Sequence, residues 1–247
     1  MDASPNLKVI SKHGAGIDTI DSAAAAVRGI RVKAAIGANA ASVAEHTWAL
    51  ILACAKDIVH LNERTHHGHW DKAIHKSLEL RGKNLGLIGI GAIGKRTAQV
   101  GLAFGMRVLA YDPFAAKPPK GITLCDIDTV LKEAHILSLH CPLNDNNKNM
   151  INRESISKMR NGAILVNTAR GGLVDEVALV DALASGKIHA VGLDSFQNEP
   201  IHGLHIFSDV QRAILTPHIG GVSSDAYVAM GVGAVQNVLV ELGLSTV

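Results

Sequence analysis

Three residues with the chemistry of proton transfer and anion binding lie at or just after the ends of hydrophobic runs: Arg170, Glu199 and His218. A histidine exchanges protons near neutral pH, a carboxylate stabilises the protonated imidazole, and an arginine presents a planar fork to a substrate carboxylate. Each has an ordinary alternative, as a turn arginine, a loop acid or a loop histidine. Their joint placement favours a site that acts on a small acid.

A glycine-rich hexapeptide with the pattern G-x-G-x-x-G spans residues 89–94. Gly89 would permit a tight turn, Gly91 a close approach of the backbone to a pyrophosphate, and Gly94 the packing of helix on strand. Asp112 ends the next hydrophobic run, where its carboxylate would bind the adenosine ribose and repel a 2′-phosphate. The alternative is a glycine turn in another kind of βα unit. The pattern favours NAD as the cofactor, in preference to NADP.

Six strand-like runs alternate with helical patterns in the same part of the chain. Helix starts are indicated by Asp126, Asn152 and Asp175, and Gly186 ends the last of these helices. The alternation predicts an α/β fold with a doubly wound, six-stranded, parallel Rossmann-type sheet. Its ligands should bind at the carboxyl ends of the strands. The six predicted strands are residues 85–90, 107–111, 136–140, 163–169, 190–195 and 213–218.

The flanks of this region have a different pattern, and they belong together only if the chain leaves a first α/β domain, builds the parallel sheet and returns; the family resemblance given below implies that this domain is an incomplete substrate domain. We predict this partial substrate domain over 1–48, the NAD-binding domain over 49–221, and over 222–247 a helix that returns to the first domain. The elements predicted in the flanks are strands at 7–11 and 30–34, helices at 22–27 and 225–242, and one long apolar helix at 42–61.

Composition narrows the classes of partner. The 247 residues are 47% hydrophobic and 19% charged with a net charge of +2, so neither disorder nor a nucleic-acid partner is indicated. The sequence has no pattern of a secretory signal, and its apolar run at 48–55 is short of the roughly 18 residues of a membrane span. We expect no membrane partner and a cytoplasmic location. Three scattered cysteines indicate reduced thiols.

A histidine-rich stretch invites a metal-binding interpretation. These histidines lie at and beyond the end of a long helix, where imidazole side chains are well tolerated. This explanation is better than a metal site, because no acidic or cysteine ligand accompanies the histidines at zinc-like spacing. We therefore expect no metal site. The histidines are His60, His66, His67, His69 and His75.

Several segments resemble those of the D-isomer-specific 2-hydroxyacid dehydrogenases, the family of phosphoglycerate dehydrogenase and hydroxypyruvate reductase. The resemblance implies that Arg170 anchors substrate, Glu199 pairs with the histidine, and His218 is the acid and base. It also implies substrate contacts at Ala15 and Gly16. The similar segments are 13–21, 42–47, 89–95, 167–172, 192–200 and 216–221. The glycine motif, the strand ends and the resemblance together give the expected cofactor contacts: Thr47, Gly89, Gly91, Ala92, Ile93, Gly94, Asp112, Cys141, Pro142, Thr168, Ala169, Asp194 and Gly220.

The activity that the resemblance implies is hydride transfer between nicotinamide and C2 of a small D-2-hydroxy acid or 2-keto acid. Substrates of phosphoglycerate or hydroxypyruvate/glyoxylate type are expected, and the sequence does not choose among them. An alternative from the same family is an NAD(H)-sensing, corepressor-like binding module. Formate oxidation is disfavoured because Glu199 stands where that branch has glutamine.

The resemblance also bears on assembly and on completeness. It implies a homodimer, in which the apolar stretch 48–55 would find a partner; an ordinary core helix is an equally good interpretation. Family members have further βα units ahead of the strand at 7–11, so we expect the substrate domain of this chain to be incomplete.

Overall fold

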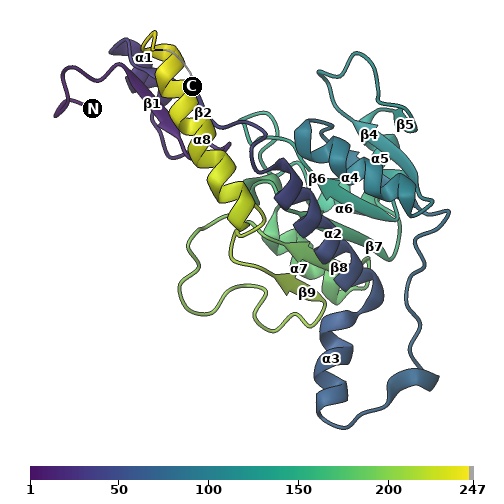
Figure 1. The fold of residues 1–247 in the computed structure, drawn as a ribbon. Helices are drawn as coiled ribbons and strands as arrows, with labels where there is room; N and C mark the ends of the chain where they lie inside the picture. Colours follow the sequence, from purple (N-terminus) through teal and green to yellow (C-terminus); the bar gives the residue numbers. More distant parts are fainter. Residues whose placement is uncertain (245–247) are drawn as a thin grey trace. The chain divides into compact units, whose positions relative to one another are not determined.

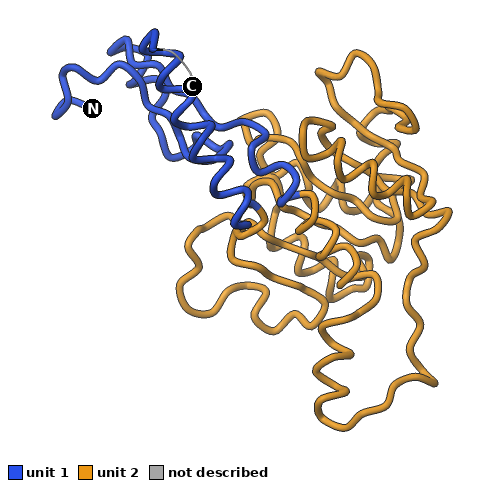
Figure 2. The backbone as a smooth tube through the Cα atoms, viewed as in Figure 1, with its two compact units in different colours: residues 1–43, 221–247 blue, residues 44–220 orange. Residues whose placement is uncertain are grey.

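The computed structural model describes residues 1–244 and divides the chain into two compact units (Figures 1 and 2). Unit 1 joins Met1–Val43 to the residues from Gly221 onward, and unit 2 is Ala44–Gly220. The domain boundaries predicted from the sequence, after residues 48 and 221, differ from these by five residues and one residue.

Unit 2 is built on a parallel sheet of seven strands in the order β5-β4-β3-β6-β7-β8-β9. The chain starts the sheet at an interior strand, β3, adds β4 and β5 on one side, and then crosses back to add β6 to β9 on the other. This reversal of direction next to β3 is typical of doubly wound folds. The strands are β3 (Asn84–Ile88), β4 (Arg107–Tyr111), β5 (Ile122–Leu124), β6 (Ile136–Leu139), β7 (Ala163–Asn167), β8 (Ile188–Leu193) and β9 (Ala213–Leu215).

The α/β class and the parallel, doubly wound sheet are confirmed, whereas the count of six strands is wrong. The strand that the sequence did not predict is β5, which has only three residues and pairs with β4 alone. So short an edge strand leaves no alternating pattern long enough to recognise.

Alternate residues of the strands face two separate hydrophobic cores, as a sheet buried on both sides requires. Leu85 and Leu87 of β3 belong to the core that contains Trp48 and Ala98, whereas Ile88 belongs to the other core. A helix that precedes the sheet in the sequence and the first crossover helix thus cover the first face, and three later helices cover the second. The first face packs on α2 (Ala40–Lys56) and α4 (Ala92–Ala103), and the second on α5 (Ile127–Glu133), α6 (Arg153–Lys158) and α7 (Glu176–Ala184) (Figure 1).

The predicted helix starts of unit 2 are confirmed. Asp126, Asn152 and Asp175 each accept hydrogen bonds from backbone N–H groups in the first turn of α5, α6 and α7. These bonds satisfy N–H groups that have no partner inside the helix. Gly186, with a φ of 74°, follows the end of α7 in the left-handed conformation that glycine adopts readily.

The prediction of one long helix over 42–61 is wrong. The chain forms two helices, α2 and α3 (Ile58–His66), separated by Asp57, whose φ of 55° is left-handed. Aspartate tolerates this conformation better than most residues, so its presence in a sequence does not reveal the break. Beyond α3 the chain forms a 3₁₀ turn, η1 (Asp71–Ala73), before it enters β3.

The apolar stretch Trp48–Ala55 lies inside unit 2. Trp48, Leu50, Ile51 and Cys54 are 5% exposed or less and pack in the core beside Leu85. The stretch is therefore an ordinary core helix, the second of the two interpretations left open by the sequence, and it needs no partner chain for its burial.

Unit 1 contains a two-stranded parallel sheet of β1 (Val9–Lys12) and β2 (Arg31–Ala34). Helix α1 (Ser22–Val27) contacts β2, and α8 (Ser224–Glu241) packs on both strands. Glu241 near the end of α8 pairs with Arg31 and Lys33 of β2. The strands predicted at 7–11 and 30–34 and the helices predicted at 22–27 and 225–242 are thus present, with ends shifted by at most two residues.

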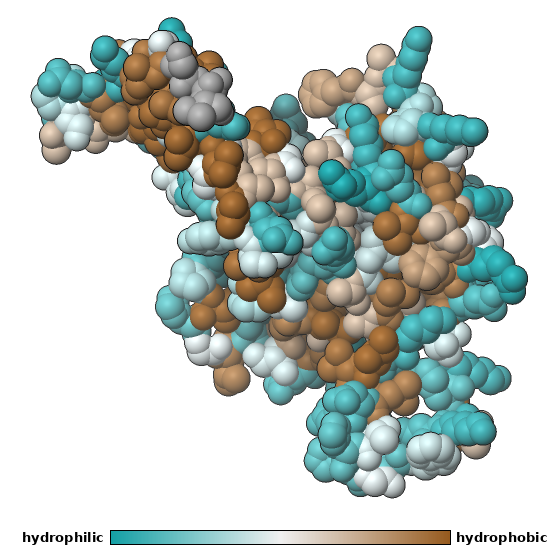
Figure 3. Space-filling model, viewed as in Figure 1, coloured by the Kyte–Doolittle hydropathy of each residue, from teal (hydrophilic) through white to brown (hydrophobic). Residues whose placement is uncertain are grey.

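The outer face of α8 is apolar. Hydrophobic side chains cover much of unit 1 in the view of Figure 3. Four valines of α8 are more than half exposed: Val228, Val232, Val235 and Val240. Among the described residues of both units, no helix combines the length and the hydropathy that a membrane crossing requires.

Candidate active site

The predicted site residues of unit 2 lie along one edge of the sheet, because all seven strands are parallel and their carboxyl ends meet there. Gly89 follows β3, Asp112 follows β4, Thr168 follows β7, and Asp194 follows β8. Except at β4, the predicted strands extend past the observed strand ends by one to three residues. Thr168, Asp194 and His218 are among these extra residues.

The glycine-rich turn has the geometry of a phosphate cradle. Gly89 has a φ of 95°, and a Cβ at Gly94 would lie 2.2 Å from the Gly89 carbonyl oxygen, so both positions require glycine. A Cβ at Gly91 would meet no atom within 4 Å. Gly91 is also the N-cap of α4, and no side chain caps the free N–H groups of that helix, which begins with Ala92 and Ile93. Open space before an uncapped helix N-terminus fits the pyrophosphate of a dinucleotide.

Asp112 is held beside this turn. One carboxylate oxygen accepts the backbone N–H of Ile90 at 2.9 Å, and the other accepts that of Phe114 at 2.9 Å. Each carboxylate oxygen has two lone pairs, so both can accept a further hydrogen bond from ribose hydroxyls. A carboxylate at this position is expected to bind the adenosine ribose and to disfavour the 2′-phosphate of NADP.

Glu199 and His218 form a direct pair. The Glu199 Oε2 atom lies 2.6 Å from His218 Nδ1, and Glu199 Oε1 accepts the backbone N–H of Phe196 at 2.8 Å. The His218 side chain is 45% exposed and that of Glu199 is 33% exposed. The predicted acid–histidine pair is therefore assembled and open to a ligand.

A buried carboxylate, Asp194, holds the loop that carries His218. Asp194 is 2% exposed and accepts the Thr216 hydroxyl at 2.6 Å, the backbone N–H of Ile219 at 2.9 Å and that of Gly220 at 2.8 Å. His46 lies against the same group. His46 and Thr216 were not predicted as site residues from the sequence, although both belong to segments that carry the family resemblance.

Arg170 occupies a tight turn after β7. The Asn167 side chain closes this turn by accepting the N–H of Ala169 and donating to the carbonyl of Arg170, and the arginine leads into a 3₁₀ turn, η2 (Gly171–Leu173). The Arg170 guanidinium donates to the Ala169 carbonyl at 2.7 Å. Beneath the turn, the hydroxyls of Thr47 and Thr168 lie 2.8 Å apart, so two predicted cofactor contacts are joined.

The segment after β6 carries Cys141 and Pro142, preceded by His140. Burial raises the pKa of the Cys141 thiol to about 11 and lowers the pKa of His140 to about 4. Cys141 is therefore a neutral thiol near pH 7, without the thiolate that nucleophilic chemistry requires. His140 is a neutral imidazole that shares a hydrogen bond of 3.0 Å with Ser138.

Two predicted substrate contacts, Ala15 and Gly16, belong to unit 1, in the loop after β1. In that loop the Gly14 carbonyl accepts the N–H of Ala35 at 3.0 Å, and Gly14 has a φ of 117°. Their role in substrate binding stays a prediction.

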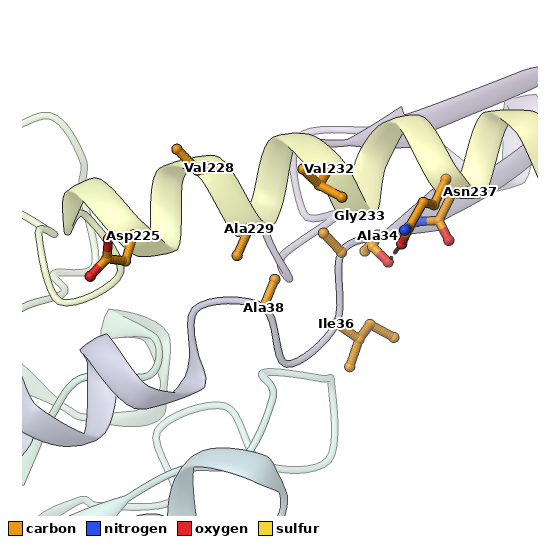
Figure 4. A pocket seen from close by; sticks show the side chains of 11 residues that line it. Ala34, Ile36, Ala38, Asp225, Val228, Ala229, Val232, Gly233 and Asn237 are labelled. Carbon is orange, nitrogen blue, oxygen red and sulfur yellow. Dashed lines mark hydrogen bonds between the residues drawn. The ribbon is translucent and has the colours of Figure 1, made fainter. Parts of the chain in front are cut away.

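Unit 1 also contains an open groove of about 810 Å³ between α8 and the segment that follows β2 (Figure 4). Its lining is mostly small and apolar, with Asp225 as its charged residue and no cation, so it does not suit an anionic substrate. Within residues 1–244, no group of three or more His, Cys, Asp or Glu side chains is placed to hold a metal ion.

Comparisons with known proteins agree with this geometry. Residues 48–220 match the family model described as "D-isomer specific 2-hydroxyacid dehydrogenase, NAD binding domain". A hydroxypyruvate reductase from Thermotoga maritima is 43% identical over 251 residues, which cover 99% of this chain and 80% of that protein. A D-3-phosphoglycerate dehydrogenase from Archaeoglobus fulgidus is 38% identical over 234 residues, which cover 94% of this chain and 44% of that protein.

Among solved structures, a D-lactate dehydrogenase from Aquifex aeolicus, complexed with NAD and lactic acid, superposes with a TM-score of 0.86. It is 34% identical, and the match covers 96% of this chain and 77% of that one. The family match covers well over half of the residues, and it falls on the sheet that carries the glycine-rich turn and the acid–histidine pair. The chain thus belongs to the D-isomer-specific 2-hydroxyacid dehydrogenases, a family of NAD-dependent oxidoreductases.

Proposed function

We propose that this chain interconverts a small D-2-hydroxy acid and its 2-keto acid with NAD(H), and that hydroxypyruvate and glyoxylate are the substrate class. The observation that supports this proposal most directly is the His218–Glu199 pair, with 2.6 Å between Nδ1 and Oε2, on the sheet that carries the dinucleotide turn. The similarity to a hydroxypyruvate reductase over nearly the whole chain supports the choice of substrate.

His218 would be the acid and base. Its Nδ1 is engaged by Glu199, which leaves Nε2 to exchange a proton with the oxygen on C2 of the substrate. The Glu199 carboxylate stabilises the imidazolium form that donates this proton. Arg170 would hold the substrate carboxylate, for which a guanidinium offers two parallel N–H donors.

The residues around the glycine-rich turn would hold the cofactor. The free N–H groups at the start of α4 suit the pyrophosphate, and Asp112 suits the adenosine ribose. Thr168, Asp194 and Gly220, at the ends of neighbouring strands and in the loop after β9, lie on the sheet edge where the nicotinamide half would extend. When bound, NAD(H) supplies or accepts the hydride.

The alternative, an NAD(H)-sensing binding module, would use the same cofactor site but would not need an acid–base pair. The relatives described above are named as enzymes. The presence of Arg170, Glu199 and His218 together favours turnover, and an activity assay separates the two functions.

The test is consumption of NADH with hydroxypyruvate, glyoxylate and phosphohydroxypyruvate. We expect turnover with at least one of them, and we expect His218→Gln and Arg170→Ala to lower kcat/KM by about 10²–10⁴-fold while NADH affinity changes little. His66→Gln, at an exposed histidine of α3, is the matched control and should keep the parent activity. NADH binding without turnover on any of the three substrates would favour the sensing module.

We further propose a homodimer that uses the exposed apolar side chains of the α3–η1 segment. Ile58, Val59, Trp70 and Ile74 are between 52% and 80% exposed and belong to one short segment of the chain, and clustered exposed apolar side chains mark interaction surfaces. Light scattering should give twice the chain mass for the parent, and Ile58→Asp with Trp70→Glu should give the monomer. A monomeric parent at assay concentration would refute the dimer and leave the catalytic proposal intact.

A further inference from the structure

A second histidine of unit 2, His46 in α2, reaches the loop that carries His218. Its Nε2 atom lies 2.8 Å from the Thr216 hydroxyl oxygen and 3.4 Å from Asp194 Oδ1. The His46 side chain is 19% exposed, so it is largely enclosed at this contact. His46 does not belong to the acid–histidine pair, and its bonds lead to the pair only through the loop.

The hydrogen bonds around Thr216 fix the direction of each donor. Asp194 accepts backbone N–H groups on both of its oxygens, from Ile219 and Gly220, and so acts as a carboxylate acceptor. The Thr216 hydroxyl, 2.6 Å from Asp194 Oδ1, must give it the single hydrogen that it has. The bond between His46 and Thr216 can then form only if His46 Nε2 carries a hydrogen and donates it.

The loop held in this way has an unfavourable backbone. His218 has a φ of 55°, in the left-handed region that residues with a Cβ normally avoid. Asp194 binds Thr216 on one side of His218 and Ile219 and Gly220 on the other, which keeps the loop in this conformation. The same conformation accompanies the contact of His218 with Glu199.

We propose that His46 is a positioning residue for His218. Its Nε2–H directs the Thr216 hydroxyl toward Asp194, and the resulting chain of bonds holds the backbone that presents His218 to Glu199. The inference rests on the proposed function, because it assigns His46 to the support of the proposed acid and base. His46 itself need not contact substrate or cofactor.

The kinetic test compares two replacements of His46. Leucine removes the donor, whereas the side-chain amide of glutamine can place an N–H near the position of Nε2. We expect His46→Leu to lower kcat by about 10–100-fold, since small misplacements of a catalytic group have costs of this size. KM for the 2-keto acid and the unfolding midpoint should change little, and His46→Gln should recover most of the rate.

A double-mutant cycle with Thr216→Val asks whether His46 acts through Thr216. The kcat of the double variant should be no more than about twofold below that of the more impaired single variant. Thr216→Val already removes the bond between His46 and Thr216, so His46→Leu has no further bond to break. Losses that multiply would overturn the proposal, as would parent-like kcat in His46→Leu.

Nitrogen NMR of protein labelled at histidine gives a readout that does not depend on turnover. The signals of the two histidines are assigned by their loss in His46→Gln and His218→Gln. The His46 signals should show a protonated Nε2. The His218 signals should shift in His46→Leu and Thr216→Val but stay near the parent values in His46→Gln. A His46 proton on Nδ1 alone, or unchanged His218 signals in both donor-deficient variants, would overturn the proposal. If the parent turns over none of the 2-keto acids, the proposed function fails, and these signals still decide whether His46 positions His218.

Discussion

Glu199 uses its two carboxylate oxygens for two different tasks: Oε2 lies 2.6 Å from His218 Nδ1, and Oε1 accepts the backbone N–H of Phe196 at 2.8 Å. The second bond tethers the carboxylate to the segment that follows β8. The carboxylate is therefore fixed in front of the imidazole, and it can both orient the ring and stabilise its positive charge.

Glu199→Gln keeps the shape of the side chain and removes its charge. We expect kcat for 2-keto acid reduction to fall by about 10²–10⁴-fold, because the protonated imidazole loses its stabilising partner. NADH affinity should stay within about twofold, because the glycine-rich turn is untouched. The matched control is Glu154→Gln on α6, an exposed acid that pairs with Lys158 and whose loss should not affect the rate. Equal kcat values in parent and Glu199→Gln would show that the pair is structural.

Asp112 should set the choice of cofactor. A carboxylate facing the 2′-phosphate of NADP(H) costs binding energy through like-charge repulsion, so calorimetry should give at least about tenfold weaker binding of NADPH than of NADH, equivalent to about 1.4 kcal/mol. Asp112→Asn keeps an acceptor for the backbone N–H of Phe114 or Ile90 and removes the charge. The dissociation constants of NADH and NADPH should therefore differ less in this variant than in the parent. Equal dissociation constants in the parent would contradict this role.

The strands and helix caps of unit 2 could be predicted from the sequence, because each has a local residue pattern that recurs along the chain. Parallel strands such as β3 and β7 are buried on both faces and therefore appear as continuous apolar runs, and the residues after them fall on one edge of the sheet by topology alone. The placement of Arg170, Glu199 and His218 followed from that rule. The helix caps Asp126 and Asn152 could also be recognised, because a cap is a local interaction.

Interactions between distant segments could not be predicted in this way. His46 and Thr216 are separated by 170 residues, and no spacing rule joins them. The break at Asp57 was missed because aspartate fits both a helix and a left-handed turn. The burial of Trp48–Ala55 within unit 2 was also undecided, since an apolar helix face indicates burial without indicating which surface covers it.

The two glycines Gly91 and Gly94 should respond differently to alanine. A Cβ at Gly94 would lie 2.2 Å from the Gly89 carbonyl oxygen, so Gly94→Ala must displace backbone, and we expect it to lower the free energy of unfolding by about 1–3 kcal/mol. A Cβ at Gly91 meets no atom within 4 Å, so Gly91→Ala should fold with nearly parent stability and bind NADH more weakly. Denaturant titration and calorimetry measure the two effects. Unchanged NADH affinity in Gly91→Ala would place the pyrophosphate elsewhere.

His140 should make the stability of the protein depend on pH in a defined window. Burial lowers its pKa from 6.5 to about 4, so between these values the unfolded chain binds a proton that the folded chain does not. The free energy of unfolding therefore rises with pH across the window, and the contribution of His140 is lost as pH falls from 6.5 toward 4, by at most about 1.4 kcal/mol per pH unit.

His140→Gln replaces the titrating ring by a neutral side chain that can still bond Ser138. Urea titrations at several values between pH 4.5 and 7.5 should give a shallower dependence for His140→Gln than for the parent, and no such difference for His66→Gln. His135 and His189 also have lowered pKa values, but they are present in all three proteins, so the comparison isolates His140. Parallel curves for parent and His140→Gln would show that His140 is protonated in the folded protein as readily as in the unfolded one.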